Sequence, residues 1–326
     1  MVNNLKKRGT IITGGAGFIG SNLIKKLLDT TKNKIFVLDN LRLGKKINLP
    51  DIDQIEFIEV DLSIENDVNS KLNFILEEYE IEEVWHLAAN SDIPAGTKDP
   101  NVDFMNTFLS TFNLLNAIKN QDLKKFHFAS SSAIYGDHGN KKIHENTAPL
   151  FPISNYGSFK LSSEAILSSY VEKNNCNLYI YRFPNVVGAP ASHGVIFDFI
   201  NRLNLKPGKL VVFGNGTQKK QYMHVEDLIS AMLKIRSCCF EKRNIYNIGA
   251  LDSGIQVSEI AELTVSMLFE GAEIEYGNEN RGWIGDVPKY EYSIDKLMSI
   301  NWSPKYKSSK EAVKKSIVEI YEQLKN

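Results

Sequence analysis

Cysteine is scarce in this sequence of 326 residues, occurring only as Cys176, Cys238 and Cys239. An odd and sparse set argues against a disulfide framework, and its spacing is not that of a zinc site, so no metal is expected. Scarce cysteine is typical of a reducing compartment. The first residues, "MVNNLKKRGTIITGG", also lack the long apolar stretch of a signal peptide. Both observations favour a cytoplasmic protein.

Charge of one sign and long hydrophobic runs are lacking as well. The formal net charge is −1, and no basic tail or block of like charges occurs. The chain therefore has little electrostatic attraction for nucleic acid or for a membrane surface, and neither is expected as a partner. No run approaches the roughly 18 apolar residues of a membrane-spanning helix. An apolar content of 43% and a charged content of 24% are those of an ordinary globular protein.

Short apolar runs alternate with amphipathic segments through the first half of the chain. This alternation predicts βαβ units and hence a parallel sheet covered by helices on both faces. Strands are predicted at 9–13, 34–40, 54–61, 83–89, 124–132 and 177–184, and helices at 14–29, 63–79, 102–119 and around Tyr156 and Lys160.

The rhythm changes beyond about residue 185. Segments become shorter, and loops carry glycine and proline, as in "KPGK" and "FGNGTQ". We expect two domains: residues 1–184 form a nucleotide-binding domain, and residues 185–326 mainly form a smaller α/β lobe that binds substrate. A C-terminal helix at 308–325 is expected to pack into this lobe.

The segment "TGGAGFIG" places Gly14, Gly17 and Gly20 three residues apart, directly after a strand and at the start of a helix. Glycines allow a tight turn and close approach to a pyrophosphate, which the helix N-terminus attracts. Asp39 ends the next strand, 19 residues after Gly20. A carboxylate there suits ribose hydroxyls and repels a 2′-phosphate, which favours NAD over NADP. The fold class is thus an α/β, Rossmann-type doubly wound sheet. Asp61 is a candidate for the adenine edge, and a helix cap is the alternative.

An ordered set of motifs resembles the extended short-chain dehydrogenase/reductase family, in its nucleotide-sugar epimerase/dehydratase branch. The resemblance covers nearly the whole chain, and within the branch it is nearest to UDP-glucose 4-epimerase-like proteins. It rests on "TGGAGFIG", "HLAA" (86–89), "SSSAIYG" (130–136), "YGSFK" (156–160), "RFPNVVG" (182–188), "SHGVIFDFINRL" (192–203), "GNGTQKKQYMHVEDL" (214–228) and "RGWIGDVP" (281–288).

The resemblance implies that Tyr156 and Lys160 are the family's Tyr-x-x-x-Lys pair, with Ser131 as the third catalytic residue. Residues four apart on a helix share a face, so the ammonium can lower the pKa of the phenol. Moving that pKa from ~10 to ~7, with help from a cationic nicotinamide, takes about 4 kcal/mol. Taken alone, the pair also fits a tyrosine beside a solvated lysine, and "SSS" fits a polar strand end.

The resemblance also implies the binding residues. In the family an arginine stands where this chain has Lys220, so the charge is kept but the forked geometry is not. The alternatives are an exposed lysine for Lys220 and a core aromatic for Tyr290, which otherwise limits the sugar pocket. The implied cofactor contacts are Gly14, Gly17, Phe18, Ile19, Gly20, Asp39, Asn40, Asp61, Leu62, Ala88, Ala89, Asn106, Tyr156 and Lys160, and the implied substrate contacts are Ser131, Ser132, Asn185, Lys220, Arg281 and Tyr290.

The residues after Ser131 bear on the reaction. Dehydratases of the family carry Asp-Glu there, whereas this chain has Ser132 and Ala133, so dehydration is not expected. The hypothesis is an NAD-dependent 4-epimerase of a nucleotide-diphosphate sugar, with a UDP-hexose first among substrates. The alternatives are a nucleotide-sugar dehydrogenase or 4-keto-sugar reductase with net redox turnover, and a non-catalytic NAD-sensing protein. Family members often pair helices around 101–119 and 156–174 between subunits, which implies a homodimer.

Overall fold

The computed structural model describes residues 6–139, 141–278 and 291–325. The chain forms two compact units, each built from separate stretches of sequence. Unit 1 comprises Met1–Ile134, Pro152–Arg182 and Ile235–Tyr246, and unit 2 comprises Tyr135–Phe151, Phe183–Lys234 and Asn247–Asn326. The chain passes from unit 1 to the long stretch 183–234 of unit 2 between residues 182 and 183, close to the expected boundary at 184/185. A single boundary does not describe the division fully, because residues 135–151 belong to unit 2 and residues 235–246 belong to unit 1.

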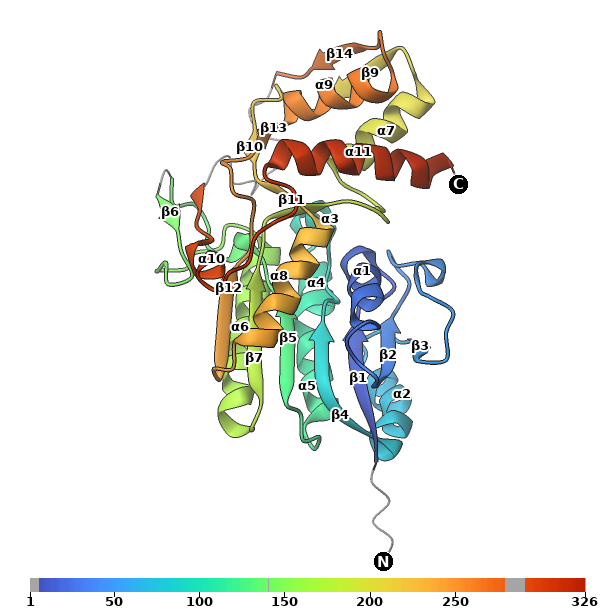
Figure 1. Cartoon of the computed structure of the whole chain (residues 1–326), viewed down its shortest axis with the longest axis vertical. Coiled ribbons are helices and arrows are strands. Elements are labelled where there is room, and N and C mark those ends of the chain that lie inside the picture. Colours follow the sequence, from blue (N-terminus) through green and yellow to red (C-terminus); the bar gives the residue numbers. More distant parts are fainter. Residues whose placement is uncertain (1–5, 140, 279–290, 326) are drawn as a thin grey trace, which may run out of the picture. The chain divides into compact units, whose positions relative to one another are not determined.

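Unit 1 is built on a seven-stranded sheet in the order β12-β7-β5-β4-β1-β2-β3 (Figure 1). The pairs β3-β2, β2-β1, β1-β4, β4-β5 and β5-β7 are all parallel. This confirms the doubly wound Rossmann-type sheet. Its elements are β1 (Lys7–Thr13), α1 (Phe18–Leu27), β2 (Lys34–Asp39), η1 (Lys46–Asn48), β3 (Ile55–Glu59), α2 (Glu65–Glu78), β4 (Tyr79–His86), α3 (Ile93–Lys98), α4 (Pro100–Asp103), η2 (Phe104–Leu109), α5 (Ser110–Ile118), β5 (Lys125–Ala129), η3 (Ser132–Ile134), α6 (Asn155–Lys173), β7 (Asn177–Arg182) and β12 (Arg243–Asn247).

Most predicted elements differ from those found by a few residues at their ends, and two differences have a structural cause. Strand β4 begins at Tyr79, four residues before the predicted start at 83, because the backbone of Lys7 already pairs with Tyr79. The single helix predicted over 102–119 is divided into the short helix α4, a π-helical segment η2 and α5. Local π geometry inside a helix is frequent at functional sites.

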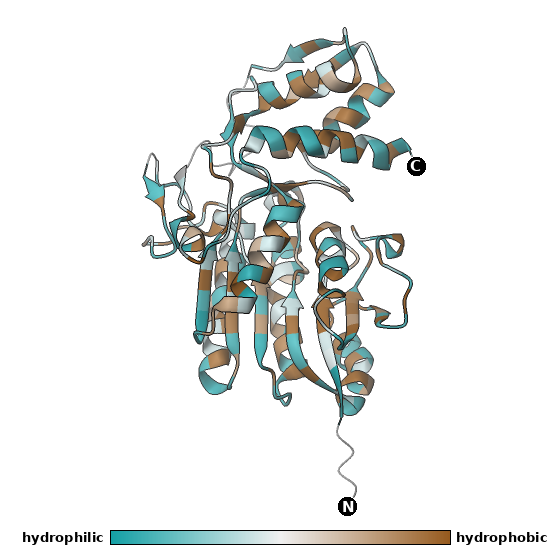
Figure 2. Cartoon of the chain, viewed as in Figure 1, coloured by the Kyte–Doolittle hydropathy of each residue, from teal (hydrophilic) through white to brown (hydrophobic). Residues whose placement is uncertain are grey.

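The core of unit 1 follows from the two faces of the sheet. Along β2, Phe36 and Leu38 point to the face covered by α2, α5 and α6. Val37 points to the opposite face, where an added Cβ on Gly15 would lie 2.6 Å from Val37 Cγ1 and 3.2 Å from Ile24 Cδ1 of α1. Both faces are buried at β2, so this strand is almost continuously hydrophobic, and brown segments recur among the strands of the sheet in Figure 2.

Unit 2 contains several two-stranded pairs in place of one sheet. β8 pairs with β11, β9 with β14, β10 with β13 and β6 with β15. A hydrophobic core is formed mainly by α7, α9 and α11, which lie together in Figure 1. Its elements are β6 (Lys142–Ile143), β8 (Asn185–Val187), α7 (Val195–Leu205), β9 (Lys209–Val212), β10 (Lys219–Lys220), β11 (Tyr222–His224), α8 (Val225–Cys238, whose last residues belong to unit 1), β13 (Ile255–Gln256), α9 (Val257–Leu268), β14 (Glu273–Tyr276), β15 (Glu291–Tyr292), α10 (Asp295–Ser299) and α11 (Ser309–Lys325).

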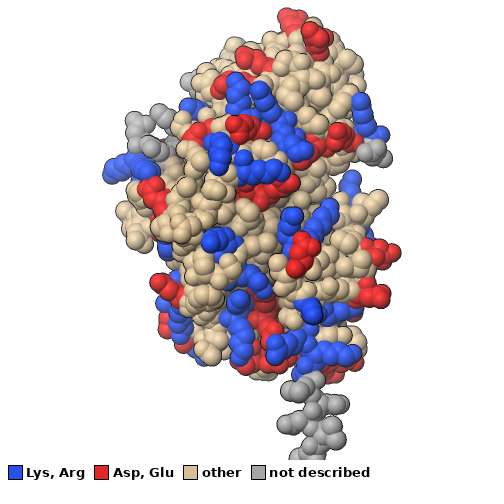
Figure 3. Space-filling model, viewed as in Figure 1, with Lys and Arg blue, Asp and Glu red and all other residues tan. Residues whose placement is uncertain are grey.

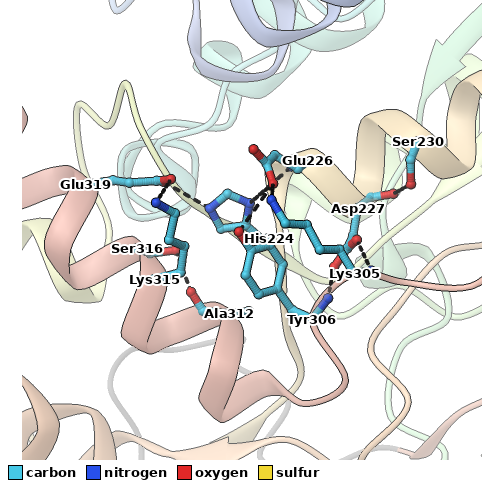
Figure 4. Close-up of polar contacts among 10 residues, drawn as sticks. All are labelled: His224, Glu226, Asp227, Ser230, Lys305, Tyr306, Ala312, Lys315, Ser316 and Glu319. Carbon is cyan, nitrogen blue, oxygen red and sulfur yellow. Dashed lines mark hydrogen bonds and ion pairs between the residues drawn. The ribbon is translucent and has the colours of Figure 1, made fainter.

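A polar cluster ties the start of α8 to the C-terminal helix α11 within unit 2 (Figure 4). His224, 1% exposed, bonds through Nε2 to Glu319 Oε2 at 2.9 Å. Asp227 accepts hydrogen bonds from the backbone N–H groups of Lys305 and Tyr306 at 2.6 and 3.1 Å. An added Cβ on Gly188 would lie 3.3 Å from His224 Nε2. The glycine of "RFPNVVG" and the histidine of "QYMHVEDL" therefore meet at one point.

Candidate active site

The glycine turn has the backbone geometry that close packing requires. Gly14 has φ +65°, and an added Cβ there would lie 2.8 Å from the Ala88 nitrogen. An added Cβ on Gly20 would lie 2.4 Å from the Gly14 carbonyl oxygen. The turn after β1 is thus pressed against the segment after β4, where the strand order reverses. Ligands of open α/β sheets bind outside the carboxyl ends of the strands at this position.

The first turn of α1 fits a pyrophosphate. Gly17 precedes the helix, makes no side-chain cap, and no acidic residue stands in the first turn. Its first N–H groups therefore retain their capacity to bind an anion, and the positive end of the helix dipole is not neutralised. Phe18 and Ile19 begin this turn and are half-buried. These features meet the requirement of a dinucleotide diphosphate.

Asp39 is held beside the glycine turn by two backbone contacts. Its Oδ2 accepts from Ala16 N at 3.0 Å, and its Oδ1 accepts from Leu41 N at 2.9 Å. Burial raises the pKa of this carboxyl, and the two backbone hydrogen bonds oppose the rise. Gly44 packs on the same carboxylate, since an added Cβ would lie 3.0 Å from both of its oxygens. The carboxylate is thus fixed at the end of β2, where a ribose-binding acid is expected.

The other expected cofactor contacts lie along the carboxyl edge of the same sheet. Asn40 is exposed after β2 and accepts from Arg42 N, whereas Leu62 is buried after β3. Asp61 Oδ1 accepts from both N and Oγ of Ser63, which forms a local turn. Ala88 and Ala89 follow β4 and are half-buried.

Asn106 lies within η2, and its Nδ2 donates to Val102 O at 2.8 Å. The neighbouring Thr107 is the fully buried residue of this segment, and its Oγ1 accepts from Asn90 N at 3.3 Å. Thr107 was not among the residues predicted from the motifs. Thr107 stands four positions from the buried Asp103 and from the buried Thr111, a helical spacing that could have indicated its inner position.

Helix α6 brings Tyr156 and Lys160 to the end of the sheet. The helix begins after Ser154, whose Oγ accepts from Gly157 N at 3.1 Å, a favourable N-cap. Lys160 is 2% exposed, and its Nζ donates to Ala129 O at 2.6 Å. The same Nζ lies 5.8 Å from the centre of the Tyr156 ring. The i, i+4 spacing therefore does place the two groups together, and the lysine is not solvated.

Ser131 completes this group at the end of β5. It is half-buried and shares a hydrogen bond with the Tyr156 side chain. An added Cβ on Gly157 would lie 2.5 Å from Ala133 O, so the start of α6 is packed directly on η3. Ser132 is half-buried within η3. The three expected catalytic residues are thus gathered within unit 1.

The pKa of Tyr156 differs from the expectation. Burial raises the pKa of Tyr156 to about 12; the Ser131 hydrogen bond opposes this rise and the charge of Asp103 adds to it. Burial lowers the pKa of Lys160 to about 7, while Glu164 and Asp103 raise it. The expected lowering of the tyrosine pKa is therefore wrong for the chain by itself, because desolvation of the phenolate dominates.

Two buried carboxylates near Lys160 were missed at the level of sequence. Glu164 pairs with Arg182 through two hydrogen bonds, of 3.0 Å to Nε and 2.6 Å to Nη2. Asp103 is 1% exposed and lies on α4. Glu164 follows Lys160 by four positions on the same helix, a signal that could have been used. No local pattern links Asp103 to α6.

Two of the expected substrate contacts lie in unit 2. Asn185 is exposed at the start of β8, and its Nδ2 donates to Gln221 O at 3.4 Å. Lys220 is half-buried on β10, which pairs with β13. Arg281 and Tyr290 lie outside the described residues.

Within the ranges that the structure describes, no group of three or more His, Cys, Asp or Glu side chains could hold a metal ion. None of the helices in those ranges is long and apolar enough to cross a membrane. The visible face of the molecule carries Lys and Arg interspersed with Asp and Glu, with no broad area of one sign (Figure 3).

The glycine turn after β1, the acidic residue at the end of β2 and the Ser/Tyr/Lys group are features of a class of nucleotide-binding enzymes. Comparison with known proteins agrees with this class. The model of the NAD dependent epimerase/dehydratase family matches residues 10–249. The chain belongs to this family, and the resemblance drawn from its motifs is confirmed. NAD is accordingly its cofactor.

Individual relatives extend over nearly the full length. A putative UDP-glucose 4-epimerase of Methanocaldococcus jannaschii is 30% identical, with 94% of this chain and 96% of that protein covered. The UDP-glucose 4-epimerase of Thermus thermophilus, solved in complex with NAD, is 28% identical with a TM-score of 0.82, covering 96% and 98%. A UDP-N-acetylglucosamine 4-epimerase of Methanobrevibacter ruminantium, solved with UDP-N-acetylmuramic acid, is 26% identical with a TM-score of 0.81, covering 98% and 100%.

Proposed function

We propose that this protein is a nucleotide-sugar 4-epimerase acting on a UDP-hexose, with NAD as a cofactor that is retained through turnover. The observation that carries the proposal is the grouping of Ser131, Tyr156 and Lys160 at the end of the sheet. The chain has Ser132 and Ala133 where a dehydratase needs an acid and a base. The names of the relatives given above support a UDP-sugar.

In this proposal unit 1 holds the cofactor and unit 2 supplies substrate contacts. The N–H groups of the first turn of α1 bind the pyrophosphate, and Asp39 binds the adenosine ribose. Asp61, Leu62, Ala88, Ala89 and Asn106 lie along the same edge, and Lys160 binds the nicotinamide ribose. NAD⁺, when bound, supplies a hydride acceptor and donor and a positive charge on its ring.

Tyr156 acts as the base that takes the proton of the sugar 4′-hydroxyl and later returns it. Ser131 donates a hydrogen bond to the same oxygen and holds the phenol in position. Bringing the pKa of Tyr156 from about 12 to near ~7 takes about 7 kcal/mol of stabilisation of the phenolate. The Lys160 ammonium and a cationic nicotinamide are the available sources. Because the proton is returned, the cycle releases none to solvent.

Substrate contacts are proposed on unit 2. Asn185 and Lys220 offer an amide and an ammonium for the phosphates or the sugar, and Arg281 offers a planar fork for the diphosphate. Tyr290 would favour an unsubstituted hexose over an N-acetyl sugar. An N-acetyl sugar, as in the name of the M. ruminantium relative, is the alternative substrate class.

A net oxidoreductase is the second candidate, because the same three residues can oxidise or reduce a sugar once per turnover. It differs in requiring exchange of cofactor and the release or uptake of a proton at each turnover. A non-catalytic NAD-sensing protein is a weaker alternative, since the tyrosine and lysine are both present. A cytoplasmic location, in line with the scarcity of cysteine, remains part of the proposal.

We also propose a homodimer through η2, α5 and α6. Phe104 and Phe112 are 36% and 39% exposed on these segments. The rings of Phe104, Phe108 and Phe159 form a cluster with centroids 5.6–6.5 Å apart. Burial of such aromatic side chains is typical of interface cores. Sedimentation velocity tests this homodimer by comparing the protein with a Phe104→Glu, Phe112→Glu double variant. We expect a dimer for the protein and a monomer for the variant, and a monomer in both cases would contradict the proposal.

The function is tested by incubating the purified protein with UDP-galactose or UDP-glucose without added NAD. Interconversion without a lasting reduced-nicotinamide absorbance, lost in Tyr156→Phe with an unchanged circular dichroism spectrum, is the expected result. Stoichiometric formation of NADH, or turnover only with added cofactor, would instead establish net redox chemistry.

A further inference from the structure

Asp103 is a buried carboxylate that the proposed reaction does not use. It ends α4 and is 1% exposed. Its Oδ1 accepts from Asn90 Nδ2 at 2.7 Å. Its Oδ2 is buried and has no hydrogen-bond partner among the described residues. A buried carboxylate oxygen without a partner is costly, so its presence calls for a reason.

The neighbouring backbone holds this carboxylate against the start of α6. An added Cβ on Gly96 of α3 would lie 1.9 Å from Asp103 Oδ2, so only glycine leaves room for it. The carbonyl oxygen of Gly96 accepts from Nδ2 of Asn155, the residue before Tyr156, at 3.0 Å. Asn90, Gly96 and Asn155 therefore fix Asp103 beside the helix that carries the proposed base.

Asp103 acts electrostatically on both Tyr156 and Lys160, and its charge raises the pKa of each. The other charged groups around it are Asp92, which precedes α3, and Lys160 on α6. Burial raises the pKa of Asp103 itself, and Asn90 and Lys160 oppose that rise.

Glu164 also raises the pKa of Lys160, and by more than Asp103 does, but Glu164 is itself paired with a cation. Glu164 is bound by Arg182 through two hydrogen bonds, so an arginine compensates its charge. His86 is fully buried, and burial together with Lys160 lowers its pKa to about 3, so it is neutral. Among the described residues, Asp103 is thus the carboxylate near Lys160 without a cationic hydrogen-bond partner.

We infer that Asp103 is a positioning residue whose negative charge keeps Lys160 an ammonium inside its buried site. This inference rests on the proposed roles of Tyr156 as base and Lys160 as its cationic partner. The same charge adds to the burial that keeps Tyr156 a phenol. Gly96 is the residue that makes room for the Asp103 carboxylate.

The sign of the effect follows from the charge. A nearby anion favours the protonated forms of both groups. Asp103→Asn preserves the shape and the bond from Asn90 but removes the charge, so both pKa values fall. If turnover requires a phenolate and an ammonium, both limbs of the kcat/KM profile move to lower pH, by about 0.5–1 unit.

The matched control is Asp92→Asn, the same chemical change on an exposed cap. Asparagine can still accept the 3.1 Å bond from Ala95 N, so the control keeps the fold and leaves both limbs in place. A second variant, Gly96→Ala, displaces the Asp103 carboxylate while keeping its charge. It is expected to move both limbs in the same direction as Asp103→Asn.

A readout independent of turnover separates this inference from the proposed function. Phenolate formation in the NAD-bound protein is followed by near-ultraviolet difference absorbance, with Tyr156→Phe identifying the signal of Tyr156. The titration midpoint is expected to fall by about 0.5–1 unit in Asp103→Asn, whether or not any sugar is epimerised. An unchanged midpoint in a folded Asp103→Asn protein would overturn the inference, even if its activity were reduced.

Discussion

The segments within each of the two units are joined by different kinds of contact. In unit 1 a continuous seven-stranded sheet fixes the position of every strand end by backbone register. In unit 2 the strands form separate pairs, and single side chains bond the backbone between them. Asp227 accepts from two N–H groups near residue 305, and Asp252 accepts from Ser309 N and Oγ. A ladder joins strands through many backbone bonds, whereas unit 2 joins its segments through a few carboxylates beside the hydrophobic core of α7, α9 and α11.

Among substitutions that test this difference between the units, the largest loss of stability is expected at Gly20 in unit 1. In Gly20→Ala the new Cβ would lie 2.4 Å from Gly14 O and 2.5 Å from Gly15 Cα, both backbone atoms that cannot move cheaply. We expect a loss of about 3 kcal/mol of stability and of most NAD affinity. Urea unfolding and NAD titration by fluorescence measure both. The control is Gly208→Ala in unit 2, where no atom lies within 4 Å; an equal loss there would contradict the packing argument.

A pH effect of similar size for each residue involved is expected from the two buried histidines of unit 1. Burial lowers the pKa of His86 to about 3 and that of His127 to about 4. The unfolded chain protonates each histidine near ~6.5, so it holds more protons than the folded chain below that pH, and stability falls as the pH falls.

We expect unit 1 to lose about 3 kcal/mol of unfolding free energy for each of these two histidines between pH ~6.5 and ~4. Urea unfolding at three pH values measures the slope, and His127→Gln should reduce it. A slope that is the same in this variant and in the parent chain would exclude His127 as its source.

A smaller loss of stability is expected in unit 2 from Asp227→Ala. The change leaves the N–H groups of Lys305 and Tyr306 without their acceptor, at a cost of about 2 kcal/mol. Glu226→Ala is the matched control, because that half-exposed side chain bonds Lys305 Nζ at the surface. Thermal unfolding by circular dichroism should rank Asp227→Ala well below the control. Equal midpoints would mean that unit 2 does not depend on this carboxylate.

The smallest effect is expected from Lys315→Met on α11. Lys315 pairs with Glu319 at 3.2 Å across one helical turn and is 45% exposed. Exposed pairs contribute little, so we expect a change below about 0.5 kcal/mol. Chemical denaturation with both proteins side by side measures this. A larger loss would show that Lys315 supports the bond between Glu319 and His224.

The parts of the site that were predictable are those with a local signature. Gly14 to Gly20 form one turn, and Tyr156 and Lys160 lie one helical turn apart, so neighbouring residues determine their geometry. Asp103 could not be found in this way, since the residues that hold it beside α6, Gly96 and Asn90, lie far from α6 in the sequence. The extent of β4 was missed for a similar reason, because pairing with β1 adds Tyr79 to a strand whose own hydrophobic run starts later.

The amino-acid sequence by itself determined the order of strands and helices, the phosphate turn and the spacing of the catalytic residues. Those features depend on hydrophobic periodicity, glycine and helical repeat, which act over a few residues. Only the tertiary structure decided the ionisation of the site, since burial raises the pKa of Tyr156 to about 12 and lowers that of Lys160 to about 7. Desolvation depends on every segment that covers a group, and those segments come from distant parts of the chain.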